Sequence, residues 1–289
     1  HKAGTTSLFN YLSDHPEVSC GDKKEIHYFT PLRYGRDIKE LVAYENHFKD
    51  SPKESKYLLD ASPSYLYGED RIVSKIFHIL NNPKVIFIFR NPTHRFISYV
   101  KKRVSEGTLS DNLDLLKFVN ESYRLSFNKD VDMPINRAFR EGCYDRFLKH
   151  WESNSNNITI LYFENLLSNP SDLLNQLCRN INISPKYYEN YDFDISNKFQ
   201  PIRNIDFHKK ALKINKLLEN ILMKNKKLKK LINKIYFSLN KREKEYSFKN
   251  YDEAVILLNN LYLNENKLIK ERLRKFKSIG PFPEWISKS

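Results

Sequence analysis

The sequence is poor in the features that mark disulfide-rich, zinc-binding and membrane-spanning chains. It holds three cysteines in 289 residues, Cys20, Cys143 and Cys178, and no C-x-x-C pair. This spacing predicts neither a disulfide framework nor a zinc site, and we expect free thiols that are at least partly buried. The sequence also lacks any run of about 18 uninterrupted apolar residues, so it predicts no membrane-spanning helix.

Acidic residues are outnumbered by basic ones. The chain has 49 Lys and Arg against 35 Asp and Glu, a formal net charge of +14. Such an excess predicts attraction to anionic partners. A nucleotide, a polyanionic saccharide, a membrane surface and nucleic acid all satisfy this condition, so charge alone leaves the partner open.

The first residues, HKAGTTSLFNYL, carry the most informative pattern of the chain. Leu8, Tyr11 and Leu12 follow helical spacing, which makes residues 4–6 the turn and start of a helix. The N–H groups and the positive dipole end of such a start favour a phosphate, with Lys2 as a mobile charge beside it. In a Walker A loop the lysine instead follows the second glycine. An ordinary helix start with a surface lysine is the alternative.

Residues 84–89, KVIFIF, form the clearest predicted strand. A continuous apolar run is typical of a parallel strand that is covered on both faces. The strand leads into Arg90, and Ser98 follows on the next predicted helix. An arginine at a strand's carboxyl end lies where open α/β sheets bind ligands, and its guanidinium suits a phosphate. Kinases and NTPases usually place a magnesium-binding aspartate at a strand end, so Arg90 argues against them.

These two segments resemble the cofactor motifs of the sulfotransferases that use PAPS (3′-phosphoadenosine 5′-phosphosulfate). Residues 2–6 are similar to the family's 5′-phosphosulfate loop, and Arg90-Asn91-Pro92 with Ser98 is similar to its 3′-phosphate motif. The resemblance implies PAPS as donor, PAP as product and no metal. It assigns donor binding to Lys2, Ala3, Gly4, Thr5, Thr6, Ser7, Arg90, Ser98, Lys198 and Arg203. Lys198 and Arg203 come from a degenerate motif, and solvated cations are the alternative for both.

The resemblance also implies a fold and its division. We expect an α/β fold with a P-loop-like central parallel sheet flanked by helices, followed by a C-terminal helical extension. Residues 1–289 would form a single domain, with a nucleotide-binding core at 1–184 and a cofactor-closing loop with C-terminal helices at 185–289. A phosphate loop of this type needs a buried strand that feeds it, so we expect an apolar strand ahead of His1.

A predicted loop at residues 20–29, CGDKKEIHYF, carries the candidate base. The first helix ends before it, near His15 and Pro16. Its KEIHYF segment is similar to the one that holds the catalytic base in sulfotransferases acting on carbohydrates and lipids. A carboxylate suits this reaction, because the attacking hydroxyl must lose its proton as the new bond forms. We therefore predict Lys2, Glu25 and His27 as catalytic, with Glu25 as base; a solvated Lys–Glu pair is the alternative.

The acceptor site departs from the pattern of the related enzymes. A short strand at residues 57–59 leads into DASPSYL, where relatives often have Gly-Glu-Lys-Ser/Thr-Pro-x-Tyr. Asp60 replaces the glutamate and Ala61 the lysine, which leaves the acceptor class open. We expect a hydroxylated acceptor, with an anionic saccharide or a lipid as the candidates.

Residues 206–244 form a lysine-rich amphipathic helical region with KNKKLKKLINK at its centre. A solvated helix face is the ordinary explanation of such a run. The functional alternative is a rim that attracts a polyanion or lipid headgroups, and hence a peripheral membrane contact. We expect no nucleic-acid partner.

The sequence thus predicts a PAPS-dependent sulfotransferase, and two other classes stay open. A P-loop kinase or NTPase would bind nucleotide with magnesium. A non-catalytic basic protein would bind polyanions or membranes without preferring a 3′-phosphorylated nucleotide. We expect a cytoplasmic protein, and a signal or anchor ahead of His1 stays open.

Overall fold

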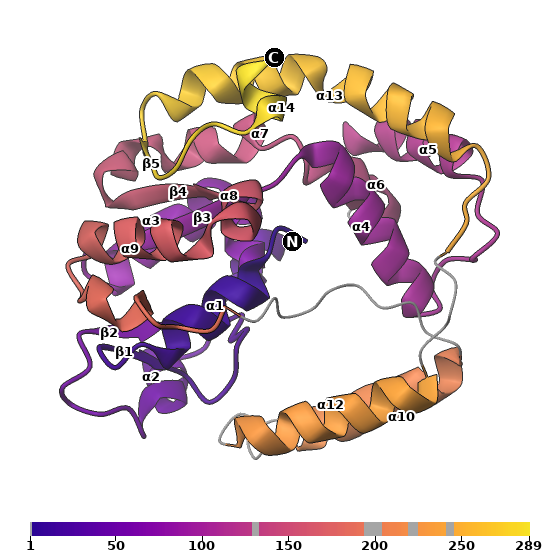
Figure 1. Ribbon diagram of the computed structural model, residues 1–289. Coiled ribbons are helices and arrows are strands. Elements are labelled where there is room, and N and C mark those ends of the chain that lie inside the picture. Colours follow the sequence, from indigo (N-terminus) through magenta and orange to yellow (C-terminus); the bar gives the residue numbers. More distant parts are fainter. Residues whose placement is uncertain (1, 129–132, 194–203, 219–224, 241–245) are drawn as a thin grey trace. The chain divides into compact units, whose positions relative to one another are not determined.

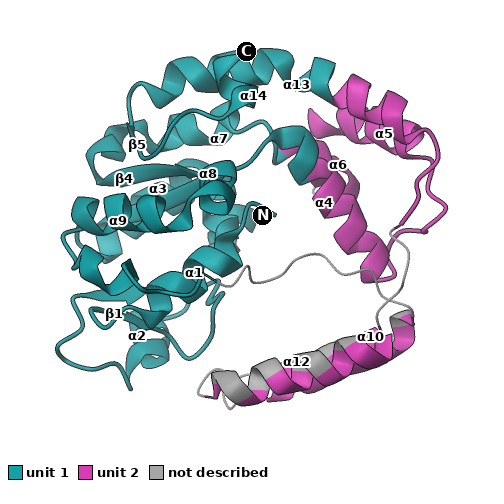
Figure 2. Ribbon diagram, viewed as in Figure 1, with its two compact units in different colours: residues 1–95, 141–196, 259–289 teal, residues 96–140, 197–258 magenta. Residues whose placement is uncertain are grey.

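The structure is a computed structural model in which residues 2–128, 133–193, 204–218, 225–240 and 246–289 are described. Lys198 and Arg203 lie outside these ranges. The chain divides into two compact units (Figure 2). Unit 1 comprises His1–Arg95, Glu141–Ser196 and Asn259–Ser289; unit 2 comprises Phe96–Arg140 and Asn197–Leu258. The predicted single domain with a division after residue 184 stays a prediction.

Unit 1 contains parallel strands in two sheets (Figure 1). In the first, β1 (Val18–Cys20) pairs with β2 (Tyr57–Leu59). In the second, β4 (Ile158–Tyr162) lies between β3 (Val85–Phe89) and β5 (Lys277–Ser278). The predicted α/β class with parallel strands and flanking helices is confirmed. Among the described residues, β2 and β3 are not paired with each other.

Helices connect and cover these strands. In unit 1 they are α1 (Thr5–Asp14), α2 (Leu41–Glu45), α3 (Glu69–Ile79), α7 (Asp145–Leu148), α8 (Phe163–Ser168), α9 (Pro170–Asn180) and α14 (Glu284–Ser287). Short 3-10 helices are η1 (Thr30–Tyr34), η2 (Asn46–Phe48), η3 (Pro63–Gly68), η4 (Lys149–Asn157) and η5 (Pro185–Tyr188). Two long helices are divided between the units, with one part of each helix in unit 1 and the other in unit 2: α4 (Pro92–Ser105) and α13 (Tyr251–Leu273).

The sheet of β3 and β4 separates two hydrophobic clusters, because successive side chains of a strand point to opposite faces. Phe87, Phe89 and Ile160 belong to the cluster that also contains the core residues of α3. Ile88 and Leu161 belong to the other cluster, with the apolar residues of α1 and α9. This arrangement buries both faces of the strand that leads to Arg90.

The helix ends follow the local sequence. Helix α1 ends at Asp14, directly before the predicted stop at His15 and Pro16. Helix α9 begins at Pro170, and the Asn169 side chain accepts a hydrogen bond from the Asp172 N–H at 3.2 Å. Proline fits this first turn because its missing N–H would have no partner in the helix.

Unit 2 is helical in its described part. It contains α5 (Leu115–Ser126) and α6 (Pro134–Arg140), and the Ser122 hydroxyl joins them by donating to the Ile135 carbonyl at 2.6 Å. The predicted lysine-rich region contains α10 (Ile205–Leu217) and α12 (Lys226–Asn240). The Asn240 side chain bonds to the backbone of Asn204 in front of α10. No helix in the described ranges is both long and apolar enough to cross a membrane.

Candidate active site

Residues 2–7, which we call the donor loop, lead directly into α1. Gly4 precedes the helix in a left-handed conformation (φ 83°), and its carbonyl accepts the first helical hydrogen bond, from Leu8 N–H at 3.1 Å. A Cβ at Gly4 would lie 2.6 Å from Cδ2 of Phe163, so both backbone angle and space require glycine. No side chain caps this helix start. Its first-turn N–H groups therefore have no intrahelical acceptor and are suited to bind an anion.

Lys2 has an unusual backbone conformation in the same loop. Its φ of 64° lies in the left-handed region, which costs a non-glycine residue about 1–2 kcal/mol. Strain of this kind is often found at ligand-binding loops, where the surrounding structure holds it in place.

Arg90 connects the donor loop to the carboxyl end of β3. Its Nη1 donates to the Lys2 carbonyl at 3.0 Å, although the two residues are 88 positions apart. Its guanidinium lies over the Phe163 ring, 4.5 Å from the ring centre. The Tyr144 hydroxyl donates to the Arg90 carbonyl at 2.8 Å and fixes the backbone there. The two segments that the sequence assigns to the donor are therefore adjacent within unit 1.

Burial and a nearby carboxylate act on the pKa of Arg90 in opposite directions. Burial lowers the pKa of the guanidinium, while the nearby Glu164 carboxylate raises it. Glu164 itself accepts a hydrogen bond from Asn91 N–H at 2.9 Å. Nε of Arg90 is buried and has no hydrogen-bond partner among the described residues. A buried cationic donor without a partner costs free energy, so this atom favours the binding of an anion.

Ser98 lies on the part of α4 that belongs to unit 2. Its predicted pairing with Arg90 at a 3′-phosphate therefore stays a prediction. The predicted roles of Lys198 and Arg203, which are outside the described ranges, stay predictions too. Ala3 and Ser7 are buried in the donor loop, whereas Thr5 is only half-buried.

The Glu25 carboxylate contacts two basic side chains, those of Lys24 and His27. Its Oε1 lies 2.7 Å from Nζ of Lys24, and its Oε2 lies 3.2 Å from Nε2 of His27. Burial raises the pKa of Glu25, but the His27 hydrogen bond and the Lys24 charge lower it by a larger amount. The pKa therefore falls from the ordinary 4.5 to about 2. The side chain keeps 37% of its surface exposed. Glu25 is therefore an ionised carboxylate that is partly open to solvent.

His27 lies between Glu25 and two hydroxyl groups. Its Nδ1 is 3.2 Å from both the Thr30 and the Ser64 hydroxyl oxygens. Its φ is 59°, and its backbone N–H donates to the Ser62 hydroxyl oxygen at 2.9 Å. The backbone bond and the two hydroxyl groups fix the ring beside Glu25.

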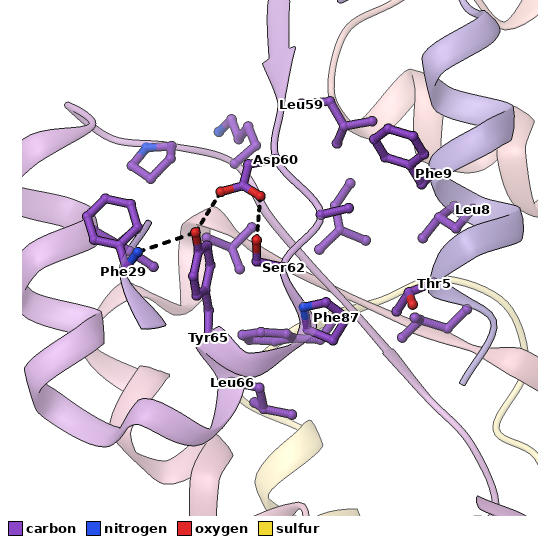
Figure 3. Close-up of a pocket in the computed structure, with 18 of the residues that line it drawn as sticks. Thr5, Leu8, Phe9, Phe29, Leu59, Asp60, Ser62, Tyr65, Leu66 and Phe87 are labelled. Carbon is purple, nitrogen blue, oxygen red and sulfur yellow. Dashed lines mark hydrogen bonds between the residues drawn. The ribbon is translucent and has the colours of Figure 1, made fainter. Parts of the chain in front are cut away.

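Hydrogen bonds connect the turn after β2 to this loop (Figure 3). Asp60 accepts hydrogen bonds from the Ser62 hydroxyl at 2.7 Å and the Tyr65 hydroxyl at 2.8 Å. The Tyr65 oxygen in turn accepts from Phe29 N–H at 3.4 Å. Burial raises the pKa of Asp60, and the two hydroxyl donors only partly offset this. The sequence indicated the turn, but the link through Ser62 to His27 is visible only in three dimensions.

A cavity of about 230 Å³ lies in unit 1 between the donor loop and this turn. Its wall includes both β2 and β3, Leu8 and Phe9 of α1, and Asp60 with Ser62 (Figure 3). Most of the other lining side chains are apolar. Within the described ranges, no group of three His, Cys, Asp or Glu side chains is placed to hold a metal ion.

Comparison with known proteins points to one family. Residues 31–186 match the family model described as "Sulfotransferase family". This range contains Arg90 and Ser98 and begins after the donor loop and Glu25. The fold is similar to the crystal structure of a sulfotransferase from Alicyclobacillus acidocaldarius, with a TM-score of 0.56 and 20% sequence identity. That similarity covers 77% of this chain and 91% of the bacterial chain, and it supports the fold alone.

A curated relative is similar over a shorter segment. The membrane-associated sulfotransferase kil1 of Dictyostelium discoideum is 34% identical over 99 residues. The matched segment covers 34% of this chain and 20% of that relative.

Proposed function

Since this chain belongs to the sulfotransferase family, we propose that it transfers a sulfuryl group from PAPS to the hydroxyl of an acceptor. The observation that carries the proposal is the 3.0 Å hydrogen bond from Arg90 to the Lys2 carbonyl. It brings together a helix start that no side chain caps, a lysine, and a half-buried arginine whose buried Nε has no hydrogen-bond partner among the described residues. These groups suit a ligand that carries several separate anionic charges.

The donor loop would bind the 5′-phosphosulfate. The N–H groups of Gly4, Thr5 and Thr6 stabilise its oxygens, and the Lys2 ammonium neutralises charge on the bridging oxygen as the S–O bond breaks. Arg90 binds the 3′-phosphate, and the part of Ser98 in this contact stays a prediction. PAP leaves with the electron pair of the broken bond, and no metal takes part.

Glu25 would act on the other side of sulfur as the general base. The acceptor oxygen attacks sulfur in line with the leaving oxygen, and its proton passes to Glu25. A carboxylate with a pKa of about 2 is a weak base. An acceptor hydroxyl that replaces the Lys24 contact would remove one cause of this low value and strengthen the base. His27 holds the opposite carboxylate oxygen and is the first alternative for the proton.

For the acceptor we propose only a chemical class. A hydroxylated saccharide or lipid fits the half-exposed Glu25 and the excess of basic residues. The relative's name describes a membrane-associated enzyme. For this chain, a peripheral membrane contact through the lysine-rich α12 is the corresponding proposal.

Transfer of label tests the reaction class. Purified protein is incubated with sulfur-labelled PAPS or with γ-phosphorus-labelled ATP, in parallel with EDTA or magnesium, against a panel of hydroxylated saccharides, lipids and phenols. We expect acceptor-dependent sulfur transfer that EDTA leaves unchanged, and no phosphoryl transfer. Magnesium-dependent phosphorus transfer would instead identify a kinase. Release of no label from either donor, with retained polyanion binding, would identify a non-catalytic basic protein.

A further inference from the structure

One aromatic side chain contacts both segments of the proposed donor site. The edge of the Phe163 ring faces Gly4, where an added Cβ would lie 2.6 Å from Cδ2 and 2.9 Å from Cε2 of the ring. The face of the same ring carries the Arg90 guanidinium, 4.5 Å from the ring centre. The loop proposed to bind one anionic group and the arginine proposed to bind another therefore contact the same ring.

The position of Phe163 follows from the register of the sheet. Strands β3 and β4 are parallel and lie side by side (Figure 1), and Phe89 pairs with Tyr162 at their carboxyl ends. Arg90 and Phe163 are the next residues, so they leave the sheet at the same level. All five residues of β4 are buried, and α8 begins at Phe163 itself. The ring thus extends from the junction of two regular elements.

Hydrogen bonds fix the backbone around Arg90 and one of its nitrogens. The Arg90 carbonyl accepts from the Tyr144 hydroxyl at 2.8 Å, and Asn91 N–H donates to Glu164 Oε1 at 2.9 Å. Nη1 of Arg90 donates to the Lys2 carbonyl at 3.0 Å. A single bond at Nη1 still permits the guanidinium plane to rotate about it, and the aromatic face removes that freedom.

The orientation of this plane matters because a guanidinium donates its hydrogen bonds in its own plane. With the plane stacked on Phe163 and Nη1 directed at the Lys2 carbonyl, the direction of Nε is set. This nitrogen is buried and has no hydrogen-bond partner in the described ranges. The electrons of an aromatic face also attract a cation at this distance. Phe163 therefore holds the guanidinium in one orientation.

We propose that Phe163 is a positioning residue that determines the preference of the site for a nucleotide with separate 5′- and 3′-phosphate groups. The inference rests on the proposed function, in which the donor loop binds the 5′ group and Arg90 binds the 3′ group. Phe163 acts through both: its edge places the loop at Gly4, and its face holds the guanidinium in the orientation that receives the 3′-phosphate.

An ordinary packing role would have a different consequence. Phe163 is half-buried and packs against the hydrophobic cluster of α1 and α9. If it served that cluster alone, any comparable loss of packing there would affect nucleotide binding in the same way. Leu177 of α9, which is fully buried in the cluster, provides the comparison.

Calorimetric titration with PAP and with AMP tests the inference, and the ratio of their Kd values measures the preference. In Phe163→Leu, which keeps an apolar side chain but has no ring face, we expect this ratio to fall about 10-fold, mainly through weaker PAP binding. Phe163→Tyr keeps the ring and should retain the wild-type ratio. Leu177→Ala should retain it too, although the cavity it leaves lowers the melting temperature.

Three results would overturn the inference: a wild-type ratio in Phe163→Leu, a ratio in Phe163→Tyr as low as in Phe163→Leu, or an equal fall in Leu177→Ala. A wild type that binds AMP and PAP equally well would instead contradict the proposed donor, and the inference would fall with it. When the wild type prefers PAP, the donor proposal stands whatever the Phe163 variants show. Binding is measured without an acceptor, so the result does not depend on turnover.

Discussion

The donor loop and the loop around Glu25 lie in the same unit but are fixed by different kinds of contact. The donor loop depends on backbone geometry: a left-handed Gly4 packed on Phe163, and a Lys2 carbonyl held by Arg90. The Glu25 loop depends on side-chain hydrogen bonds that run from Asp60 through Ser62 to His27. The first kind of support fixes positions of N–H donors, whereas the second sets protonation and orientation.

This difference predicts separable effects. Changes in the donor loop should alter nucleotide binding and stability, because in the proposed function its groups contact the donor before and during the reaction. Changes in the Glu25 loop should alter turnover and its pH dependence, because proton transfer occurs only in the transition state. Each prediction below tests one side of this comparison.

The largest effect is expected for Glu25→Gln. The amide keeps the shape of the side chain but cannot accept the proton, so kcat should fall by about 100-fold or more while PAP affinity stays nearly intact. Steady-state kinetics and a nucleotide titration measure the two effects. Glu54→Gln, a change of the same type at an exposed carboxylate, is the control. Normal turnover of Glu25→Gln would move the base to His27.

Gly4→Ala should damage the donor side. The new Cβ would lie 2.6 Å from Phe163 at a φ of 83°, and we expect a loss of about 1–3 kcal/mol in the free energy of unfolding. We also expect PAP affinity to fall about 10-fold, which corresponds to a binding free energy that is weaker by about 1.4 kcal/mol. Gly35→Ala is the matched control, because Gly35 also has a positive φ (67°) but faces only the flexible end of Arg71. Equal PAP affinity for both variants would contradict the role of the turn.

Acid stability should report on the Glu25 side. The folded pKa of about 2 lies below the ordinary 4.5, so ionised Glu25 stabilises the fold above pH 4.5, and this contribution disappears as the pH falls toward 2. The difference in unfolding free energy between the wild type and Glu25→Gln should be constant from pH 5 to 7 and shrink below pH 4.5. Its size should be modest, because the side chain is partly exposed. A gap that widens in acid would show that the Lys24 and His27 contacts are absent in solution.

The smallest effect is expected from the lysine-rich helix. Neutralising Lys226, Lys227, Lys229 and Lys230 should raise the KM of an anionic acceptor a few-fold and weaken its salt dependence. Exposed charges are screened over about 10 Å at 0.1 M salt. Assays at low and high salt therefore measure both the rise in KM and the loss of its salt dependence. An unchanged KM at low salt would leave α12 as a solvated helix.

Local patterns predicted much of the fold. The strand at Tyr57–Leu59 and the helix end before His15 agree with the sequence, because apolar runs and proline act over a few residues. Strands β1 (Val18–Cys20) and β5 (Lys277–Ser278) were missed. They are too short to carry an alternating pattern and exist only through pairing with distant strands.

In the candidate site, too, local motifs were informative, whereas contacts between distant residues were not predicted. Lys2, Gly4, Glu25 and Arg90 were predicted as site residues from short motifs, but the sequence could not show which of them are in contact. Phe163, Glu164 and Tyr144 surround Arg90 through contacts 54 to 74 positions away, and no local pattern marks them. Asp60 was noted only as a departure from the pattern of relatives, whereas the structure connects it to the His27 backbone through the Ser62 hydroxyl.

The union of Lys2 and Arg90 in one donor site is tested most directly by thermal unfolding with nucleotides in the absence of magnesium. Adenosine 3′,5′-bisphosphate should raise the melting temperature far more than AMP or ATP, because only a ligand that binds the folded state stabilises it. In Arg90→Ala this preference should disappear, while Arg71→Ala, at an exposed arginine, should keep it. Equal shifts with AMP and the bisphosphate in the wild type, or an intact preference in Arg90→Ala, would contradict the account.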